Sequence, residues 1–186
     1  MKEDIKFMSI NVAVVTISDT RTLENDKSGD VLEKRIKQAG HIVLAREIVQ
    51  DEFEKISSLF SNLIKDKKID VIISTGGTGL TGRDITPEVM ETLFEKSIDG
   101  FGEMFRWMSY KKIGTSALQS RALAGVANGT YIFCLPGSPS ACRDGWDNIL
   151  VHQLDIRHKP CNFVEIMPRL QEHEYYRTKN WCPVLR

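Results

Sequence analysis

The chain has 186 residues, which is enough to bury about 70% of its unfolded surface around one core. This length favours one domain, because two full domains usually need a longer chain. Lysine and arginine together number 25, as do aspartate and glutamate, and this zero formal charge argues against a general nucleic-acid or membrane-surface binder. A hydrophobic fraction of 41% with 27% charged residues is typical of a globular protein and excludes a disordered chain. Any anion that the chain binds must therefore be held by a local group of residues and not by the overall charge of the protein.

No targeting or membrane segment is predicted near the N-terminus. The apolar run at residues 12–17 is far shorter than the roughly 20 residues that a membrane helix requires, and it lacks the basic flank and cleavage site of a signal peptide. We therefore expect a cytoplasmic protein without a membrane partner. The four cysteines form no C-x-x-C pair and the four histidines show no metal-ligand spacing, so neither a zinc site nor a disulfide framework is expected.

Strands and helices are predicted to alternate in the first part of the chain. The β-branched run at residues 11–18 predicts a strand that is buried on both faces, and apolar residues at helical spacing predict the helices that follow it and the next strand. The predicted strands cover residues 11–18, 41–49 and 69–74, and the predicted helices cover residues 28–39 and 51–64. Such alternation is typical of parallel strands joined by crossover helices, and ligands in such sheets bind at the carboxyl ends of the strands.

The second half of the chain is predicted to add further helices and a turn. Thr86 and Pro87 suit an N-cap followed by proline in the first helical turn, whereas residues 100–115 have a mixed pattern and are predicted to be only weakly helical. Asn128-Gly129, between two apolar runs, predicts a two-residue hairpin turn. The fold class is therefore α/β: a three-layer α/β/α single domain with a mainly parallel sheet and a small antiparallel hairpin.

Four glycines within residues 76–82 follow the third predicted strand. Backbone amides without side chains there are able to cradle phosphate oxygens. The spacing also fits a dinucleotide-binding fingerprint, but Pro87 would then fall inside the helix that must begin at the glycines. A P-loop requires a lysine and a hydroxyl residue where Arg83-Asp84 stands. A plain glycine turn that only reverses the chain is the remaining alternative.

Two aspartates, Asp51 and Asp84, follow the carboxyl ends of predicted strands. An aspartate just beyond a phosphate-binding loop can hold Mg²⁺, although an Asx turn or an ion pair with Arg83 would equally explain Asp84. Asp51 and Glu54 have the spacing of a capping box, which makes Asp51 the expected N-cap of the second helix. A capping aspartate keeps lone pairs free, so the two carboxylates are able to converge on one metal ion.

The segment Pro136-Gly-Ser-Pro-Ser140 forms a second junction between a strand and a helix, with Ser138 as the expected N-cap. Amide donors, the helix dipole and two hydroxyl groups there suit an anion, although a plain helix cap explains the same residues. Nearby cations and rings are candidates for ligand contacts or, alternatively, for surface ion pairs and core packing: Arg83, Arg106, Arg121, Phe101, Phe105 and Trp107.

Several separated motifs occur together in a particular order. They are Ser74 to Asp84 with Thr86-Pro-Glu88, Gly100 to Glu103, Ser120-Arg121 with Ala124-Gly125, and Leu135-Pro-Gly-Ser-Pro139. In this combination the chain resembles the molybdopterin-binding MoaB/MogA family of molybdenum cofactor biosynthesis, from residue 12 to about residue 163. Residues 118–128 and 159–163 resemble the MoaB branch in particular.

The resemblance implies a molybdopterin adenylyltransferase, in which the terminal phosphate of molybdopterin attacks the α-phosphate of ATP, pyrophosphate leaves, and Mg²⁺ bridges the phosphates. By matching positions, it makes Asp51 and Asp84 the catalytic and metal-binding pair. It also assigns substrate and ATP contacts to a phosphate-binding loop of Thr75, Gly76, Gly77, Thr78 and Gly79, and to a facing wall of Pro136, Gly137, Ser138 and Ser140.

The resemblance further implies a homotrimer or homohexamer, with other proteins of the pathway as partners and no nucleic acid. Residues 1–163 then form the molybdopterin-binding domain. Residues 164–186 form a C-terminal extension without a match, and the tail from residue 159 is expected to be extended and packed on the body or on a neighbouring subunit. The resemblance also implies that some MoaB-type proteins, which have lost an acidic position or the arginine before the second one, bind without catalysing. Asp51, Arg83 and Asp84 are all present here, which favours an active enzyme over a non-catalytic binding or assembly protein.

Overall fold

A six-stranded sheet forms the centre of the structure, a computed structural model that describes residues 5–172. Its strands are β1 (Asn11–Ile17), β2 (Ile42–Val49), β3 (Val71–Thr75), β4 (Lys96–Ser97), β5 (Leu123–Ala127) and β6 (Thr130–Leu135). They lie in the order β2, β1, β3, β6, β5, β4, and the first four are parallel, whereas β5 is antiparallel to both of its neighbours. The expected mainly parallel sheet is confirmed.

Both faces of the central strands are buried, which explains why their sequences are continuous apolar runs. Successive side chains of a strand point to opposite faces of the sheet. Val12 and Val14 of β1 accordingly belong to the core on one face, and Ala13 and Val15 belong to the core on the other. A sheet of this kind needs helices on each face to remove the apolar side chains from water.

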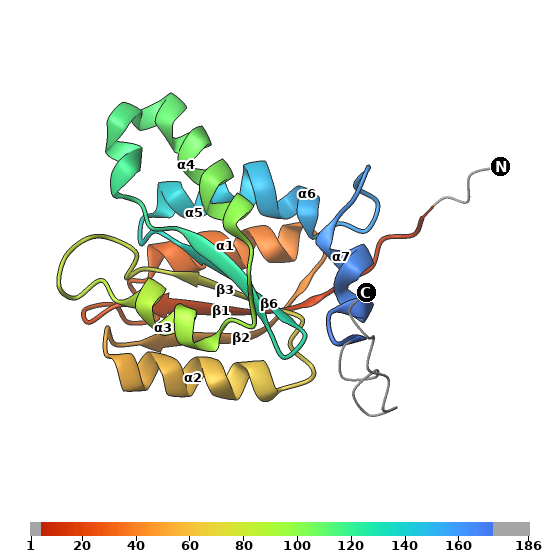
Figure 1. Cartoon of the computed structure of the whole chain (residues 1–186), viewed down its shortest axis with the longest axis horizontal. Helices are drawn as coiled ribbons and strands as arrows, with labels where there is room; N and C mark the ends of the chain where they lie inside the picture. The colour runs from red at the N-terminus through yellow and green to blue at the C-terminus, as the bar shows by residue number, and fades with distance from the viewer. Residues whose placement is uncertain (1–4, 173–186) are drawn as a thin grey trace, which may run out of the picture.

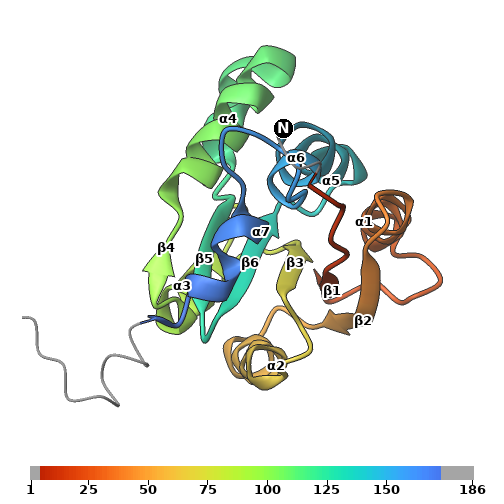
Figure 2. The ribbon, with the colours of Figure 1, turned by 90° about the vertical axis from the view of Figure 1, so that its right-hand side faces the viewer.

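Two layers of helices cover the sheet, as Figures 1 and 2 show. On one face lie α2 (Phe53–Lys65) and α3 (Thr86–Leu93). On the other face lie α1 (Lys27–Gln38), α4 (Asp99–Ile113), α5 (Pro139–Gly145), α6 (Val151–Gln153) and α7 (Phe163–Ile166). A 3₁₀ helix, η1 (Gly114–Gln119), follows α4, and a π-helical turn, η2 (Trp146–Leu150), joins α5 to α6. The expected three-layer α/β/α fold is therefore confirmed.

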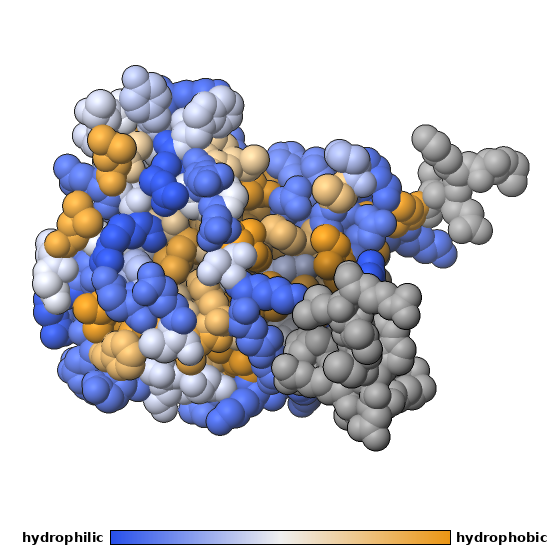
Figure 3. All heavy atoms as spheres, in the orientation of Figure 1, coloured by the Kyte–Doolittle hydropathy of each residue, from blue (hydrophilic) through white to orange (hydrophobic). Residues whose placement is uncertain are grey.

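The face in Figure 3 is largely hydrophilic, with apolar groups scattered over it. Within residues 5–172, no helix combines the length and the apolar character needed to span a membrane.

The antiparallel hairpin is confirmed at its turn. Ala127 lies opposite Thr130 in the pairing of β5 with β6, so the turn contains two residues. Asn128 has a φ of 49° and Gly129 a φ of 82°. Two successive left-handed residues define a type I′ turn, which asparagine and glycine adopt at low cost. The dipeptide therefore sets the register of the two strands.

Two expectations about helices are wrong. The segment expected to be weakly helical forms α4, a helix of 15 residues. It lacks a single apolar stripe because Phe101 is buried in the core, whereas Met104 and Trp107 remain exposed. Thr86 is the first residue of α3 rather than its N-cap, a position that Ile85 occupies without a side-chain hydrogen bond.

Residues 160–172 pack on the body of the domain, as expected, but they contain a short helix instead of being extended. Asn162 begins α7 by accepting a hydrogen bond from the N–H of Glu165 at 2.8 Å. The Tyr131 hydroxyl donates to the carbonyl oxygen of Phe163 at 3.1 Å, which ties α7 to β6. Residues 173–186 of the C-terminal extension, with the aromatic residues Tyr175, Tyr176 and Trp181, lie outside the described residues.

His41 is a buried histidine at the start of β2. The centroid of its ring lies 5.1 Å from that of Phe7 and 6.4 Å from that of Trp146, and its Nδ1 accepts a hydrogen bond from the N–H of Ile10 at 3.3 Å. Burial lowers the pKa of His41, and the nearby charge of Asp155 offsets this only in part. The folded protein therefore binds a proton at His41 less readily than the unfolded chain does.

We expect this histidine to make the folded state less stable in acid. Its contribution should be complete above about pH 6.5, the pKa of an unfolded histidine, and should be lost as the pH falls below that value. Urea unfolding of the wild type and of His41→Gln at about pH 7.5 and about pH 5.5 measures the effect. The drop in unfolding free energy between the two conditions should be smaller in the variant, and equal drops would contradict the assignment.

Candidate functional site

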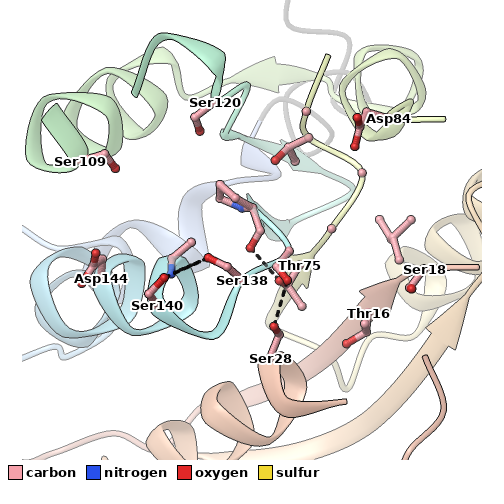
Figure 4. Close-up of a pocket in the computed structure, with 18 of the residues that line it drawn as sticks. Thr16, Ser18, Ser28, Thr75, Asp84, Ser109, Ser120, Ser138, Ser140 and Asp144 are labelled. Atoms are coloured by element: carbon pink, nitrogen blue, oxygen red, sulfur yellow. Dashed lines mark hydrogen bonds between the residues drawn. The ribbon is translucent and has the colours of Figure 1, made fainter. Parts of the chain in front are cut away.

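The carboxyl ends of the four parallel strands meet at one edge of the sheet, where a cavity of about 750 Å³ lies. The loops after β1, β3 and β6 line it, and α4 and α5 lie across from the glycine-rich loop (Figure 4). Asp51 is not among the lining residues, but every other residue predicted for the site is: Thr75, Gly76, Gly77, Thr78, Gly79, Asp84, Pro136, Gly137, Ser138 and Ser140.

The glycine loop, which we define as residues 76–84, begins in a conformation that favours glycine. Gly76 has a φ of 110° and Gly77 a φ of 64°. Thr86 holds the carbonyl groups of both residues: its Oγ1 donates to Gly76 O and its N–H donates to Gly77 O, each at 3.0 Å. The start of the loop is therefore fixed by the first residue of α3.

Arg121 holds the next two carbonyl groups. Its backbone N–H donates to Thr78 O at 3.0 Å, and its Nε donates to Gly79 O at 2.7 Å. The N–H groups of Gly77 and Thr78, in contrast, have no hydrogen-bond acceptor within residues 5–172. A loop whose carbonyls are occupied and whose amides are free is suited to an anion.

Asp84 closes the glycine loop. Its carboxylate accepts hydrogen bonds from the N–H of Thr81 at 2.9 Å and from the Thr81 hydroxyl at 2.6 Å. Burial raises the pKa of Asp84, but the hydrogen bonds from Thr81 and Gly79 outweigh burial and lower it overall. Arg83 pairs with Asp19 at 2.7 Å, so the alternative of an Arg83 to Asp84 ion pair is wrong. Asp84 is therefore a local turn residue that stays ionised and faces the cavity.

Asp51 does not cap α2, contrary to the capping-box expectation. Glu52 occupies the N-cap position, and no side chain accepts a hydrogen bond there. The carboxylate of Asp51 lies against the glycine loop, because a Cβ added at Gly77 would be 3.0 Å from its Oδ1. Burial raises the pKa of Asp51, and the negative charges of Asp19 and Asp84 raise it further.

The absence of a cap bond gives a stability prediction. We expect Asp51→Ala to change the free energy of unfolding by less than about 0.5 kcal/mol, because no hydrogen bond to α2 is lost. Ser138→Ala is the matched comparison and should cost about 1 kcal/mol, because Ser138 Oγ accepts from the N–H of Ala141 at 3.1 Å. Urea denaturation measures both. Equal losses would show that Asp51 does cap the helix.

The carboxylates near the loop fit magnesium only in combination with a substrate. Within residues 5–172 there is no group of three or more histidine, cysteine, aspartate or glutamate side chains suited to a metal ion. Mg²⁺ usually takes one or two carboxylates and completes its octahedron with water and substrate phosphates. Asp51, beside Gly77, and Asp84, beside Gly79, provide that kind of donor set next to the free loop amides.

The facing wall, residues 136–140, comes very close to the glycine loop. A Cβ added at Gly137 would lie 3.3 Å from Gly76 Cα. Ser138 is the N-cap of α5, as expected, and its Oγ lies 3.1 Å from that of Ser140. Hydroxyl groups at the start of a helix are therefore available on the opposite side of the cavity from the loop amides.

Thr75, the last residue of β3, links the start of the glycine loop to the facing wall. Its Oγ1 donates to the carbonyl oxygen of Pro136 at 2.9 Å and accepts from the thiol of Cys142 at 3.1 Å. Burial raises the pKa of Cys142 to about 11. The thiol is therefore neutral and has a packing role.

The sequence did not indicate the residues that the helices bring to the cavity. Ser28, near the start of α1, lines the cavity and donates to Gly137 O at 3.2 Å. Lys112 of α4 and Asp144 of α5 form an ion pair at 2.5 Å, and both also line the cavity. Because α1 follows β1, its first turn could have been placed at this edge from the topology. The residues of α4 arrive there through tertiary packing, which leaves no local signal.

The other candidate ligand contacts have local partners. Arg106 donates to the carbonyl oxygen of Ala122 at 3.1 Å. Trp107 is exposed, and the Nζ of Lys111 lies 3.4 Å from the centroid of its ring. Phe101 and Phe105 pack in the core, although Phe105 also touches the cavity.

A mainly parallel sheet between two helix layers, with a cavity at the carboxyl ends of its strands, defines an α/β protein of the class whose ligands generally bind at that edge of the sheet. A family model described as "Probable molybdopterin binding domain" matches residues 13–156. The chain belongs to the MoaB family of molybdenum cofactor biosynthesis.

Individual relatives are similar to this chain over most of their own length. Molybdenum cofactor biosynthesis protein B of Escherichia coli K12 is 46% identical over 158 residues, which cover 85% of this chain and 93% of the relative. The protein of the same name from Bacillus cereus is 42% identical over 146 residues, covering 78% and 86%. A crystal structure of molybdenum cofactor biosynthesis protein B superposes with a TM-score of 0.80 at 38% identity, covering 89% of this chain and 98% of that one.

Proposed function

We propose that the chain is a molybdopterin adenylyltransferase, which transfers AMP from ATP to the terminal phosphate of molybdopterin and releases pyrophosphate. The observation that carries the proposal is the glycine loop, whose free Gly77 and Thr78 amides lie beside the carboxylates of Asp51 and Asp84. Donors for phosphate oxygens next to a pair of carboxylates are what transfer at a phosphorus atom requires.

In the proposed reaction, an oxygen of the terminal phosphate of molybdopterin attacks the α-phosphorus of ATP. The bond from the α-phosphorus to the oxygen bridging it to the β-phosphorus breaks, and pyrophosphate leaves with the electron pair. The loop amides donate to the phosphate oxygens of one substrate. Ser138 and Ser140, on the facing wall, orient the other substrate for the attack. Mg²⁺ held by Asp51 and Asp84 would offset the charge that grows on the leaving pyrophosphate. The nucleophile belongs to the substrate, so no covalent enzyme residue is needed.

A second candidate is a non-catalytic molybdopterin-binding or assembly protein of the same pathway. The position of Asp51 favours it, because this carboxylate is outside the cavity lining and its pKa is raised by burial and by neighbouring negative charge. A protein of this kind would bind molybdopterin saturably, without a requirement for magnesium, and would release no pyrophosphate.

One experiment separates the two candidates. The purified protein is incubated with ATP, Mg²⁺ and molybdopterin, and adenylylated molybdopterin and pyrophosphate are measured by chromatography. Formation of both products in equal amounts, dependent on Mg²⁺, supports the transferase. Saturable pterin binding without either product overturns the transferase and supports the binding protein.

We also propose that the chain assembles into a homotrimer or homohexamer and works in the cytoplasm with other proteins of the pathway. Exposed apolar side chains on α4 and on η1, which follows it, support self-association. Apolar groups gathered on neighbouring elements of a surface are typical of a protein interface. The exposed side chains are Met104, Trp107, Tyr110, Ile113 and Leu118. Light scattering during size-exclusion chromatography distinguishes three copies from six, and a monomer would contradict the proposal.

A further inference from the structure

We infer that Arg121 is a positioning residue, which keeps the carbonyl groups of the glycine loop turned away from the cavity so that the loop offers N–H groups to an anion. The inference rests on the proposed function, which assigns a phosphate to this loop. Arg121 lies just before β5 and is not among the residues that line the cavity. It therefore acts through the loop rather than by touching the ligand.

Arg121 binds three carbonyl oxygens of the same loop. Its backbone N–H reaches Thr78 O at 3.0 Å, its Nε reaches Gly79 O at 2.7 Å, and its Nη2 reaches Asp84 O at 2.6 Å. The remaining nitrogen, Nη1, pairs with Glu88 of α3. All of the guanidinium nitrogens are thus engaged by the loop or by the helix that follows it.

Two of these contacts hold the ends of the exposed segment 80–83. Leu80 at its start is 67% exposed, so apolar packing does little to fix this segment. If Arg121 were absent, the peptide groups at Gly79 and Asp84 would be free to rotate and to turn a carbonyl oxygen toward the cavity, where it would repel a phosphate. The planar guanidinium can reach both oxygens because its donors are spread over three nitrogens in a rigid fork, whereas all three donors of lysine are on a single nitrogen.

The test measures how tightly the protein binds inorganic pyrophosphate, used as the probe. Calorimetric titrations compare the wild type with Arg121→Lys and Arg121→Gln. Arg35→Lys is the matched control, because Arg35 is also partly buried and forms a two-pronged pair, with Asp147, outside the cavity. We expect the Arg121 variants to bind pyrophosphate about tenfold more weakly and Arg35→Lys to bind as the wild type does. Thermal unfolding is recorded in parallel, because a merely structural role would lower Tm without changing the affinity of the folded protein.

Measurements on the wild type keep the test independent of how the variants fold. The backbone amide resonances of Gly77 and Thr78 should shift when pyrophosphate is added, and the Nε–H of Arg121 should exchange slowly with solvent. If the two amides do not shift, the loop binds no phosphate, and both this inference and the proposed function are overturned. If they shift but Arg121→Lys binds as tightly as the wild type, or if the Nε–H exchanges rapidly, only the positioning role is overturned.

Discussion

Asp84→Asn is expected to slow adenylyl transfer by roughly 100-fold to 1,000-fold, the loss typical when one preorganised electrostatic contact to the reacting groups is removed. The substitution preserves the shape of the side chain and an oxygen that can accept from Thr81, so the glycine loop should keep its conformation. What it removes is the negative charge that the proposed mechanism needs beside the phosphates. Initial rates of pyrophosphate release, measured with saturating ATP and molybdopterin, give the effect directly.

Two comparisons make the Asp84 prediction specific. Molybdopterin binding by Asp84→Asn should stay within a few-fold of the wild type, because the loop amides and the facing wall are unchanged. Asp147→Asn removes a carboxylate paired with Arg35 outside the cavity and should leave the rate unaltered. Turnover by Asp84→Asn within about threefold of the wild type would show that this carboxylate has no part in the transfer step.

Gly76→Ala is expected to destabilise the fold by at least about 3 kcal/mol. A Cβ at this position would lie 2.1 Å from the carbonyl oxygen of Ile17, which is backbone and cannot move aside cheaply, and the φ of 110° is itself strained for alanine. The N–H of Gly76 also donates to Leu135 O at 3.0 Å, so a shift of the loop would break the link between β3 and β6 at the cavity. Urea unfolding of the variant measures the loss.

Gly100→Ala is the control for the Gly76 prediction. Gly100 lies in the first turn of α4, and no atom is within 4 Å of a Cβ added there. Alanine should stabilise this position by roughly 0.4–1 kcal/mol, because it restricts the unfolded chain and favours the helix. A Gly76→Ala variant that loses less than about 1 kcal/mol would mean that the junction of β1 and β3 adapts more easily than its geometry indicates.

The elements that the sequence predicted correctly depend on local chemistry. Strands β1 and β3 follow from β-branched runs that are buried on both faces, and the hairpin follows from a dipeptide able to adopt two left-handed residues in succession. The prediction that Asp51 caps α2 was wrong. A capping-box pattern shows which residues are able to cap a helix, but it does not show that a hydrogen bond to the helix forms. In the structure, helix α2 begins one residue later, and the Asp51 carboxylate turns to the glycine loop instead.

The candidate site was likewise predicted in part, where local sequence and topology decide it, and missed where tertiary packing decides it. The rule that parallel strands present their carboxyl ends at one edge was enough to bring the glycine loop and the facing wall together in advance. The sequence marked Arg121 as a nearby cation and as part of a family motif but gave no role for it, because most of its partners are backbone carbonyl oxygens, which leave no pattern in a sequence. The contributions of α4 depend on how a helix with exposed and buried apolar residues packs, and this is decided by the whole fold.

The ion pair between Lys112 and Asp144 joins α4 to α5 at the wall of the cavity. The side chain of Lys112 is 59% exposed, and ion pairs of this kind contribute only about 0–1 kcal/mol. The two side chains are therefore held together only weakly. This part of the cavity wall is accordingly adaptable, because its two side chains can separate beside a ligand at a small cost in free energy and without a rearrangement of the sheet.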